Sequence, residues 1–185
     1  MRVSVVLRSR DEADRLRLTL ASLTRQTVGA EIVVVDDGSV DHTPNVIAEA
    51  AASLPLTVVR HETARGRSAA ANAGARAATG ELLLFLDGDT LAGREFVAQH
   101  ATLHATGDRL VARGETFHLR GTRFLRDPET GSPAPGQEAR IARLPAVELQ
   151  QIRVTRAQVL DDFAAIERKA NPGIYPGAGP QRLYE

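Results

Sequence analysis

The sequence contains no cysteine among its 185 residues. This absence excludes a disulfide-stapled scaffold, a thiolate nucleophile and a zinc site built from cysteines. The formal net charge is zero, so there is no field of one sign to favour nucleic acid or an anionic membrane as partner. No apolar run approaches the roughly 20 residues that a membrane-spanning helix requires. We therefore expect no nucleic-acid partner and no transmembrane segment.

The length fits one domain of ordinary size, which at this length buries about 70% of its extended surface. The first residues, 1–8, are too short and too quickly charged for a signal peptide, and their pattern favours a strand instead. We therefore expect a cytoplasmic protein. All but one of the 23 basic residues are arginine, the exception being Lys169, which favours a bacterial protein from a GC-rich genome.

Apolar runs alternate with helical patterns through the first half of the chain. Short runs rich in valine and leucine are typical of buried strands, and the stretches between them have apolar residues at helical spacing. The predicted strands are 3–7, 31–36, 56–60 and 81–86, and the predicted helices are 11–24, 42–53 and 66–78. This alternation predicts an α/β fold with a mostly parallel sheet flanked by helices. Such folds bind ligands beyond the carboxyl ends of their strands.

The pattern loosens after residue 89. We expect a helix at 95–106, a strand within 110–119, and an exposed loop from 120 to 137 that is rich in Arg, Gly, Pro and Asp. Two short helical patterns occupy 138–170, the stronger at 155–170. We therefore divide the chain into a core, residues 1–119, and a loop with a helical extension, residues 120–185.

The fourth predicted strand ends in Asp87-Gly88-Asp89. Two aspartates one residue apart can face one point, and Gly88 permits a sharp turn and the close approach of a ligand. Hard divalent cations prefer carboxylate oxygens, and magnesium is commonly shared between carboxylates and substrate phosphates. The alternative is a polar β-turn, in which Asp-Gly is common.

The second predicted strand ends in Asp36-Asp37, and an acid at such a position can bind a ribose or a base N–H. The alternative is that Ser39 or Asp41 caps the next helix while Asp37 stabilises the turn. Arg65 lies where the third strand passes into its helix, a position from which it can contact a base or phosphate. The alternative there is a solvated arginine.

Other motifs are absent or weak. His100 and His104 have the spacing of two metal ligands on one helix face, but no third ligand is evident, so we favour a solvated face. No phosphate-binding P-loop and no dinucleotide fingerprint follows a strand. A phosphoacceptor domain also ends a strand in paired acids, but it needs a lysine to accompany them, and the only lysine here is Lys169, far down the chain. A sugar nucleotidyltransferase needs a glycine-rich loop with Arg or Lys after the first strand, and residues 9–12 do not supply it.

In their order and spacing, the segments of the first half resemble the opening of glycosyltransferase family 2. The likeness covers about residues 2–100 and is carried by segments 3–6, 23–27, 31–43, 65–74 and 79–89. It implies a GT-A fold and the transfer of a sugar, with inversion, from a nucleoside diphosphate sugar to an unknown acceptor. A UDP-sugar is the favoured donor, and Mg²⁺ or Mn²⁺ is the implied cofactor.

The resemblance also implies roles for single residues in a nucleoside pocket. Asp36 and Asp37 would hold the base and the ribose. Ser9 and Asp11, after the first strand, would line the same pocket, and Arg65 would lie against the base.

At the end of the fourth strand, the resemblance places Asp87 and Gly88 beside the ribose or donor sugar. Asp89, together with Asp87, would ligate the metal on the diphosphate. The family's acceptor half, with a carboxylate as general base, has no convincing match here. The late pair Asp161-Asp162 falls inside a predicted helix and is interpreted as a solvated face. We therefore expect a truncated enzyme, or alternatively a nucleotide-sugar-binding module without turnover.

Overall fold

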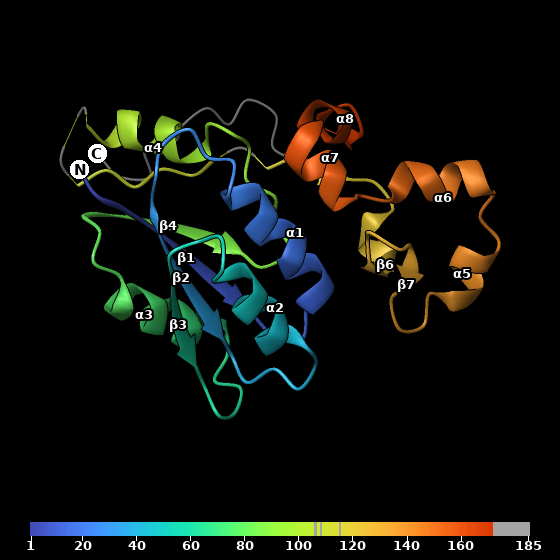
Figure 1. Cartoon of the computed structure of the whole chain (residues 1–185), viewed down its shortest axis with the longest axis horizontal. Coiled ribbons are helices and arrows are strands. Elements are labelled where there is room, and N and C mark those ends of the chain that lie inside the picture. Colours follow the sequence, from blue (N-terminus) through green and yellow to red (C-terminus); the bar gives the residue numbers. More distant parts are fainter. Residues whose placement is uncertain (106, 108, 115, 172–185) are drawn as a thin grey trace. The chain divides into compact units, whose positions relative to one another are not determined.

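Figure 1 shows the computed structural model, which describes residues 1–105, 107, 109–114 and 116–171. The chain forms two compact units, Met1–Thr102 and a second that begins at Leu103. The functional boundary expected between residues 119 and 120 stays a prediction. Within the described ranges, no helix combines the length and the apolar character needed to cross a membrane.

The first unit contains every strand and helix that the sequence predicts there, with small shifts at their ends. The elements are β1 (Val3–Ser9), α1 (Ala13–Leu23), β2 (Glu31–Asp36), α2 (Thr43–Ala50), β3 (Leu56–Arg60), α3 (Arg67–Ala77), β4 (Leu82–Asp87) and α4 (Phe96–His104). Pro44 lies in the first turn of α2, where a missing N–H costs no helical hydrogen bond.

The four strands form one parallel sheet in the order β3-β2-β1-β4. The central strands β1 and β2 are buried along nearly their whole length, which explains why most of their residues are apolar. The edge strand β3 is mostly exposed, so its apolar run reflects strand propensity more than burial. The mostly parallel sheet flanked by helices is confirmed.

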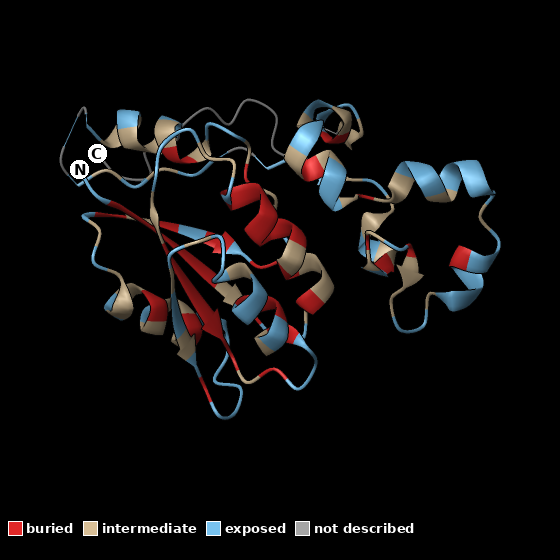
Figure 2. Ribbon diagram, viewed as in Figure 1, coloured by how far each residue is buried: buried red, intermediate tan, exposed pale blue. Residues whose placement is uncertain are grey.

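Helices cover both faces of the sheet (Figure 1). One face packs against α1, α2 and α4 in a core that includes Val5, Leu7, Leu16, Leu20, Val34, Val46, Leu84 and Val97. On the other face, Gly74 of α3 lies so close to Val6 and Val35 that any side chain there would collide with them. The burial colours of Figure 2 show this core running through the central strands and α1.

The second unit differs from the sequence prediction in three places. Of the described residues in 110–119, only β5 (His118–Leu119) is a strand, and it pairs antiparallel with β8 (Ala170–Asn171). The predicted loop 120–137 instead holds a 3-10 turn, η1 (Thr122–Phe124), and a hairpin of β6 (Leu125–Asp127) and β7 (Ser132–Pro133). The hairpin was missed because its strands are too short to show a period of two.

The helical patterns of 138–170 form four short helices, not two: α5 (Glu138–Ala142), α6 (Ala146–Ile152), α7 (Arg156–Asp161) and α8 (Phe163–Glu167). The predicted helix 155–170 is broken at Asp162, whose carboxylate accepts a hydrogen bond from Ala165 N at 3.2 Å and so caps α8. A capping box between Thr155 and Gln158 starts α7. Short polar side chains that compete for backbone N–H groups thus decide where these helices begin.

Candidate functional site

The polar residues at the carboxyl ends of β1, β2 and β4 meet at one edge of the sheet. In the strand register, Ser9 lies beside Asp36, and Arg8 lies beside Asp87. Asp36 also lies beside Arg60, the last residue of β3. The expectation that these strand ends share an edge is confirmed by this register. The parallel sheet alone therefore gathers most of the residues that the sequence singled out.

Asp36 and Ser9 each present a buried oxygen without a hydrogen-bond partner. Asp36 is 1% exposed, and its Oδ1 accepts a bond of 2.9 Å from Ser39 N. Its Oδ2 lies 3.6 Å from Arg60 Nε, but neither this oxygen nor Ser9 Oγ has a hydrogen bond within the described part of the chain. Buried polar atoms are rarely left unpaired, so these two oxygens mark a place where a ligand can donate hydrogen bonds.

Asp37, by contrast, is fully engaged by the protein. It is 5% exposed, and its carboxylate accepts bonds from His61 Nδ1 (2.6 Å), Arg65 N (2.9 Å) and Gly66 N (2.8 Å). Burial alone would raise the pKa of Asp37, but these hydrogen bonds outweigh it and hold the pKa below its usual range. These contacts hold the loop that follows β3, whereas the sequence alternative placed Asp37 in the turn that follows β2. The nucleotide contact that the resemblance implies stays a prediction.

Asp11 joins the loop after β1 to the loop after β2. It has φ of 53°, a conformation that is uncommon for a residue with a side chain. Its N–H donates to Ser39 Oγ at 3.0 Å, and its Oδ1 accepts from Val40 N at 2.8 Å. Asp41 adds to this link by accepting from Ala13 N and Thr43 N, the first residues of α1 and α2. The two loops therefore hold one another. Asp41 also binds the first N–H of α2, as the sequence alternative proposed, although His42 is the N-cap residue of that helix.

Asp87, the last residue of β4, and Asp89, in the turn after it, each face an arginine. Arg8 Nε and Nη2 lie 2.7 and 2.6 Å from Asp87 Oδ1, and Arg15 Nη1 lies 3.6 Å from Asp89 Oδ2. The side chains of Asp87 and Asp89 are 51% and 41% exposed, so a ligand can reach both. Gly88 between them packs against Ser9, where a Cβ would lie 2.9 Å from Ser9 Oγ. A glycine is therefore required there by packing.

Glu12 is a third carboxylate of this group. Burial raises its pKa to about 7, and the negative charges of Asp89 and Asp87 contribute to the rise, while Arg15 and Arg67 oppose it. Within the described ranges, no three histidine or carboxylate side chains form a preassembled metal site. The group is instead a set of mutually repelling acids balanced by arginines, which a cation shared with a phosphate would relieve.

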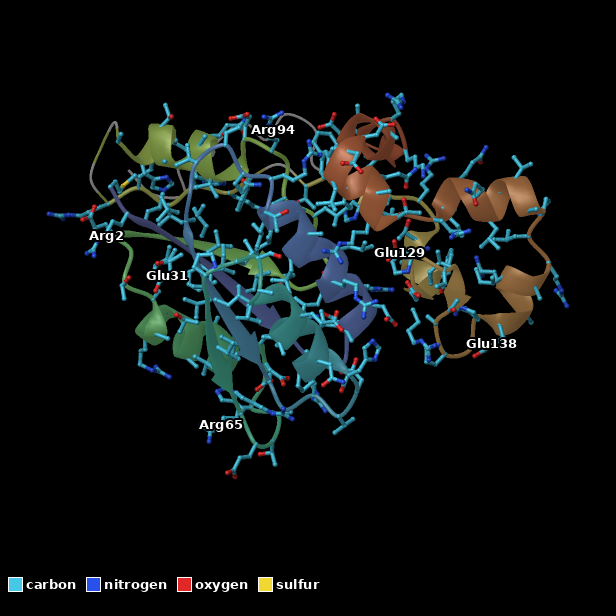
Figure 3. The ribbon with its side chains drawn as sticks, viewed as in Figure 1. Arg2, Glu31, Arg65, Arg94, Glu129 and Glu138 are labelled. Atoms are coloured by element: carbon cyan, nitrogen blue, oxygen red, sulfur yellow. The ribbon has the colours of Figure 1, made fainter. Side chains whose placement is uncertain are left out.

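Arg65 lies in the loop between β3 and α3 (Figure 3). Its backbone N–H is held by Asp37, while its side chain is exposed and has no ion pair or hydrogen bond with any residue that the structure describes. It is therefore available to a ligand, unlike Arg8 and Arg15.

Sequence reasoning assigned no role to Arg8, Arg15, Glu12 or His61. Arg8 and Glu12 belong to the polar residues at and just after the end of β1, and His61 directly follows β3. Their position at the end of a strand was the signal that could have identified them. Arg15 lies inside α1 and offered no such signal, because only the packing of α1 beside the turn after β4 brings it to Asp89.

The sequence model of the family Glycosyl transferase family 2 matches residues 4–168 of the chain. It is 34% identical over 116 residues to YfnE of Bacillus subtilis, an uncharacterized glycosyltransferase, and this covers 62% of the chain and 30% of YfnE. It is 40% identical over 107 residues to validoxylamine A glucosyltransferase of Streptomyces hygroscopicus subsp. jinggangensis, covering 56% of the chain and 25% of that enzyme. The chain thus spans less than a third of the length of these two relatives.

Solved structures of GT-A fold enzymes resemble the chain as well. The mannosyltransferase PcManGT of Pyrobaculum calidifontis, in complex with GDP-Man and Mn²⁺, matches with a TM-score of 0.58 and 28% identity, over 69% of this chain and 39% of that one. TarS of S. aureus in complex with UDP-GlcNAc matches with a TM-score of 0.55 and 29% identity, over 57% of this chain and 32% of that one. The predicted GT-A fold is confirmed, and since the family match extends over most of its residues, the chain belongs to glycosyltransferase family 2.

Proposed function

We propose that this chain binds a nucleoside diphosphate sugar at the carboxyl edge of its sheet and transfers the sugar to an acceptor with inversion. A UDP-sugar is the favoured donor. Support comes from the family, from neighbours solved with UDP-GlcNAc and GDP-Man, and from the two buried oxygens of Ser9 and Asp36 that lack a hydrogen bond among the described residues. The last observation carries the proposal, because it belongs to this chain's own site.

In this arrangement, Asp36 Oδ2 and Ser9 Oγ accept hydrogen bonds from the base or the ribose. A ligand that donates to them removes the cost of leaving two buried acceptors unpaired. Asp11 lines the same pocket by holding the loop 39–40 in place. Arg65 contacts the base or a phosphate with its exposed guanidinium, which suits planar and anionic groups.

The residues after β4 fit a divalent cation. Asp89 and Asp87 are accessible carboxylates, Glu12 lies in their field, and such a donor set matches Mg²⁺ or Mn²⁺ shared with phosphate oxygens. When bound, the cation supplies stabilisation of negative charge on the departing diphosphate. Arg8 and Arg15 hold the two aspartates in place through their ion pairs. Gly88 brings the turn close to Ser9, so that the diphosphate and the nucleoside share one pocket.

A second candidate is a donor-binding module without turnover. In the late acid pair, Asp162 is already in structural use, since it caps α8 and lies 3.7 Å from Arg168 Nη2. Inverting transfer needs a base to deprotonate the acceptor hydroxyl. The structural use of Asp162 is the observation that supports this second candidate.

Titration calorimetry with UDP and MnCl₂ tests donor binding, with GDP as the comparison nucleotide. We expect UDP to bind and Asp36→Asn to weaken it by about tenfold or more, because a charged acceptor is replaced by an amide. Glu49→Gln, an exposed acid of α2, is the matched control and should bind as the parent chain does. No binding of either nucleotide would refute the proposal.

An assay of mass-labelled UDP-sugar then separates the two candidates. Hydrolysis or transfer of the sugar supports the enzyme, and binding with neither supports the module.

A further inference from the structure

We propose that His61 and Asp37 form a positioning pair that holds the 61–66 loop, so that Arg65 is presented to the donor. This inference rests on the proposed function, since Arg65 is the residue through which the pair would act. It assigns Asp37 to the protein's own loop and not to the nucleotide, which departs from the role that the family resemblance implies.

The pair lies one residue beyond the sheet. Asp36 and Arg60 are neighbours in the register of β2 and β3, and Asp37 and His61 are the residues that follow them. His61 is 7% exposed, its N–H donates to Asp36 O at 3.0 Å, and its Nδ1 lies 2.6 Å from Asp37 Oδ1. A buried, charge-assisted bond of this length is among the stronger hydrogen bonds in proteins. The end of β3 is therefore tied to the end of β2.

The same carboxylate also holds the far end of the loop. Asp37 accepts the N–H groups of Arg65 and Gly66 at 2.9 and 2.8 Å. In the middle, Gly38 approaches the loop so closely that a Cβ would lie 2.6 Å from Ala64 N. The loop is thus fixed at its start, middle and end by residues 37–38.

This fixation matters because the loop is otherwise solvated. Residues 62–68 are all exposed, so the hydrogen bonds to Asp37 replace a packed core as the source of order. A fixed backbone at Arg65 lowers the entropy that its side chain loses when it meets a ligand. Asp37 N also donates to Ser9 O at 3.0 Å, so the same residue ties Arg65 to the oxygens proposed to receive the nucleoside.

A double-mutant cycle tests the action through Arg65, with UDP affinity measured by calorimetry. We expect His61→Ala to weaken UDP binding by about tenfold. His61→Asn should restore most of it, because the amide offers an N–H donor close to the position of Nδ1. In the Arg65→Ala background, His61→Ala should cost nothing further.

Arg76→Ala, an exposed arginine in the last turn of α3, is the control background and should leave the effect of His61→Ala intact. Equal losses in the parent and the Arg65→Ala backgrounds would overturn the inference, since a merely structural effect of His61 is independent of Arg65.

Amide hydrogen exchange keeps the inference testable whether or not UDP binds. If the pair holds the loop, its loss should expose the amides of Arg65 and Gly66 to solvent. We expect these amides to exchange at least about tenfold faster in His61→Ala and in the isosteric Asp37→Asn than in the parent chain. Unchanged exchange at these amides in Asp37→Asn would overturn the positioning role, even if His61→Ala failed to fold. Faster exchange together with no UDP binding by the parent chain would uphold the positioning of the loop and refute the proposed function alone.

Discussion

The raised pKa of Glu12 predicts that the free energy of unfolding falls as the pH rises. Its carboxyl is partly buried beside Asp89 and Asp87, and its pKa in the folded chain is about 7 against an ordinary value of 4.5. Because the folded chain binds this proton more tightly than the unfolded chain, protonated Glu12 favours folding. The contribution is complete below pH 4.5 and is lost as the pH rises through 7.

The magnitude follows from the separation of the two pKa values. Each pH unit is worth about 1.4 kcal/mol, so the loss is at most about 3.5 kcal/mol. Solvent that reaches this partly buried group screens the repulsion, and we expect a loss of about 1–2 kcal/mol. The Glu12→Gln variant keeps the shape but not the charge, so it should lack this loss.

Urea denaturation at pH values from 5 to 8, in EDTA to keep the chain free of metal, measures the effect. The free energy of unfolding of Glu12→Gln is subtracted from that of the parent chain at each pH. The contribution of the five histidines cancels in this difference, because both proteins share them. Glu49→Gln on α2 is the control and should titrate as the parent does. A difference that stays constant from pH 5 to 8 would refute the account of Glu12.

Two further predictions concern the metal and the packing of α3. Asp89→Asn should weaken Mn²⁺-dependent binding of UDP by well over tenfold, because a charged ligand is lost. Unchanged affinity by calorimetry would refute the assignment of Asp89 as a metal ligand. Gly74→Ala should destabilise the chain by about 1–3 kcal/mol despite the better helix propensity of alanine, because the new Cβ would collide with Val6 and lie 2.9 Å from Val35 Cγ2. Gly29→Ala, with no atom within 4 Å of the added Cβ, is its control, and equal urea midpoints for the two variants would contradict this reasoning.

Sequence patterns predicted the first unit well because its elements have strong, local signals. Central strands such as Val3–Ser9 are buried on both faces and are therefore mostly apolar, and Leu16 and Leu20 of α1 show the spacing of one buried helix face. The second unit was predicted less well, because its strands have two or three residues and its helices end at capping side chains such as Asp162. Elements this short depend on contacts with the rest of the unit.

By itself, the sequence determined that Ser9, Asp36 and Asp87 would lie along one edge, because parallel strands all place their carboxyl ends on the same side of a sheet. Only the tertiary structure decided what each oxygen does there. It leaves Asp36 Oδ2 and Ser9 Oγ without a hydrogen bond from any described residue, and it engages Asp37 with His61 and the 65–66 backbone. Hydrogen bonds and electrostatic repulsion depend on distances of a few ångströms between segments far apart in the chain, and a linear pattern does not contain those distances.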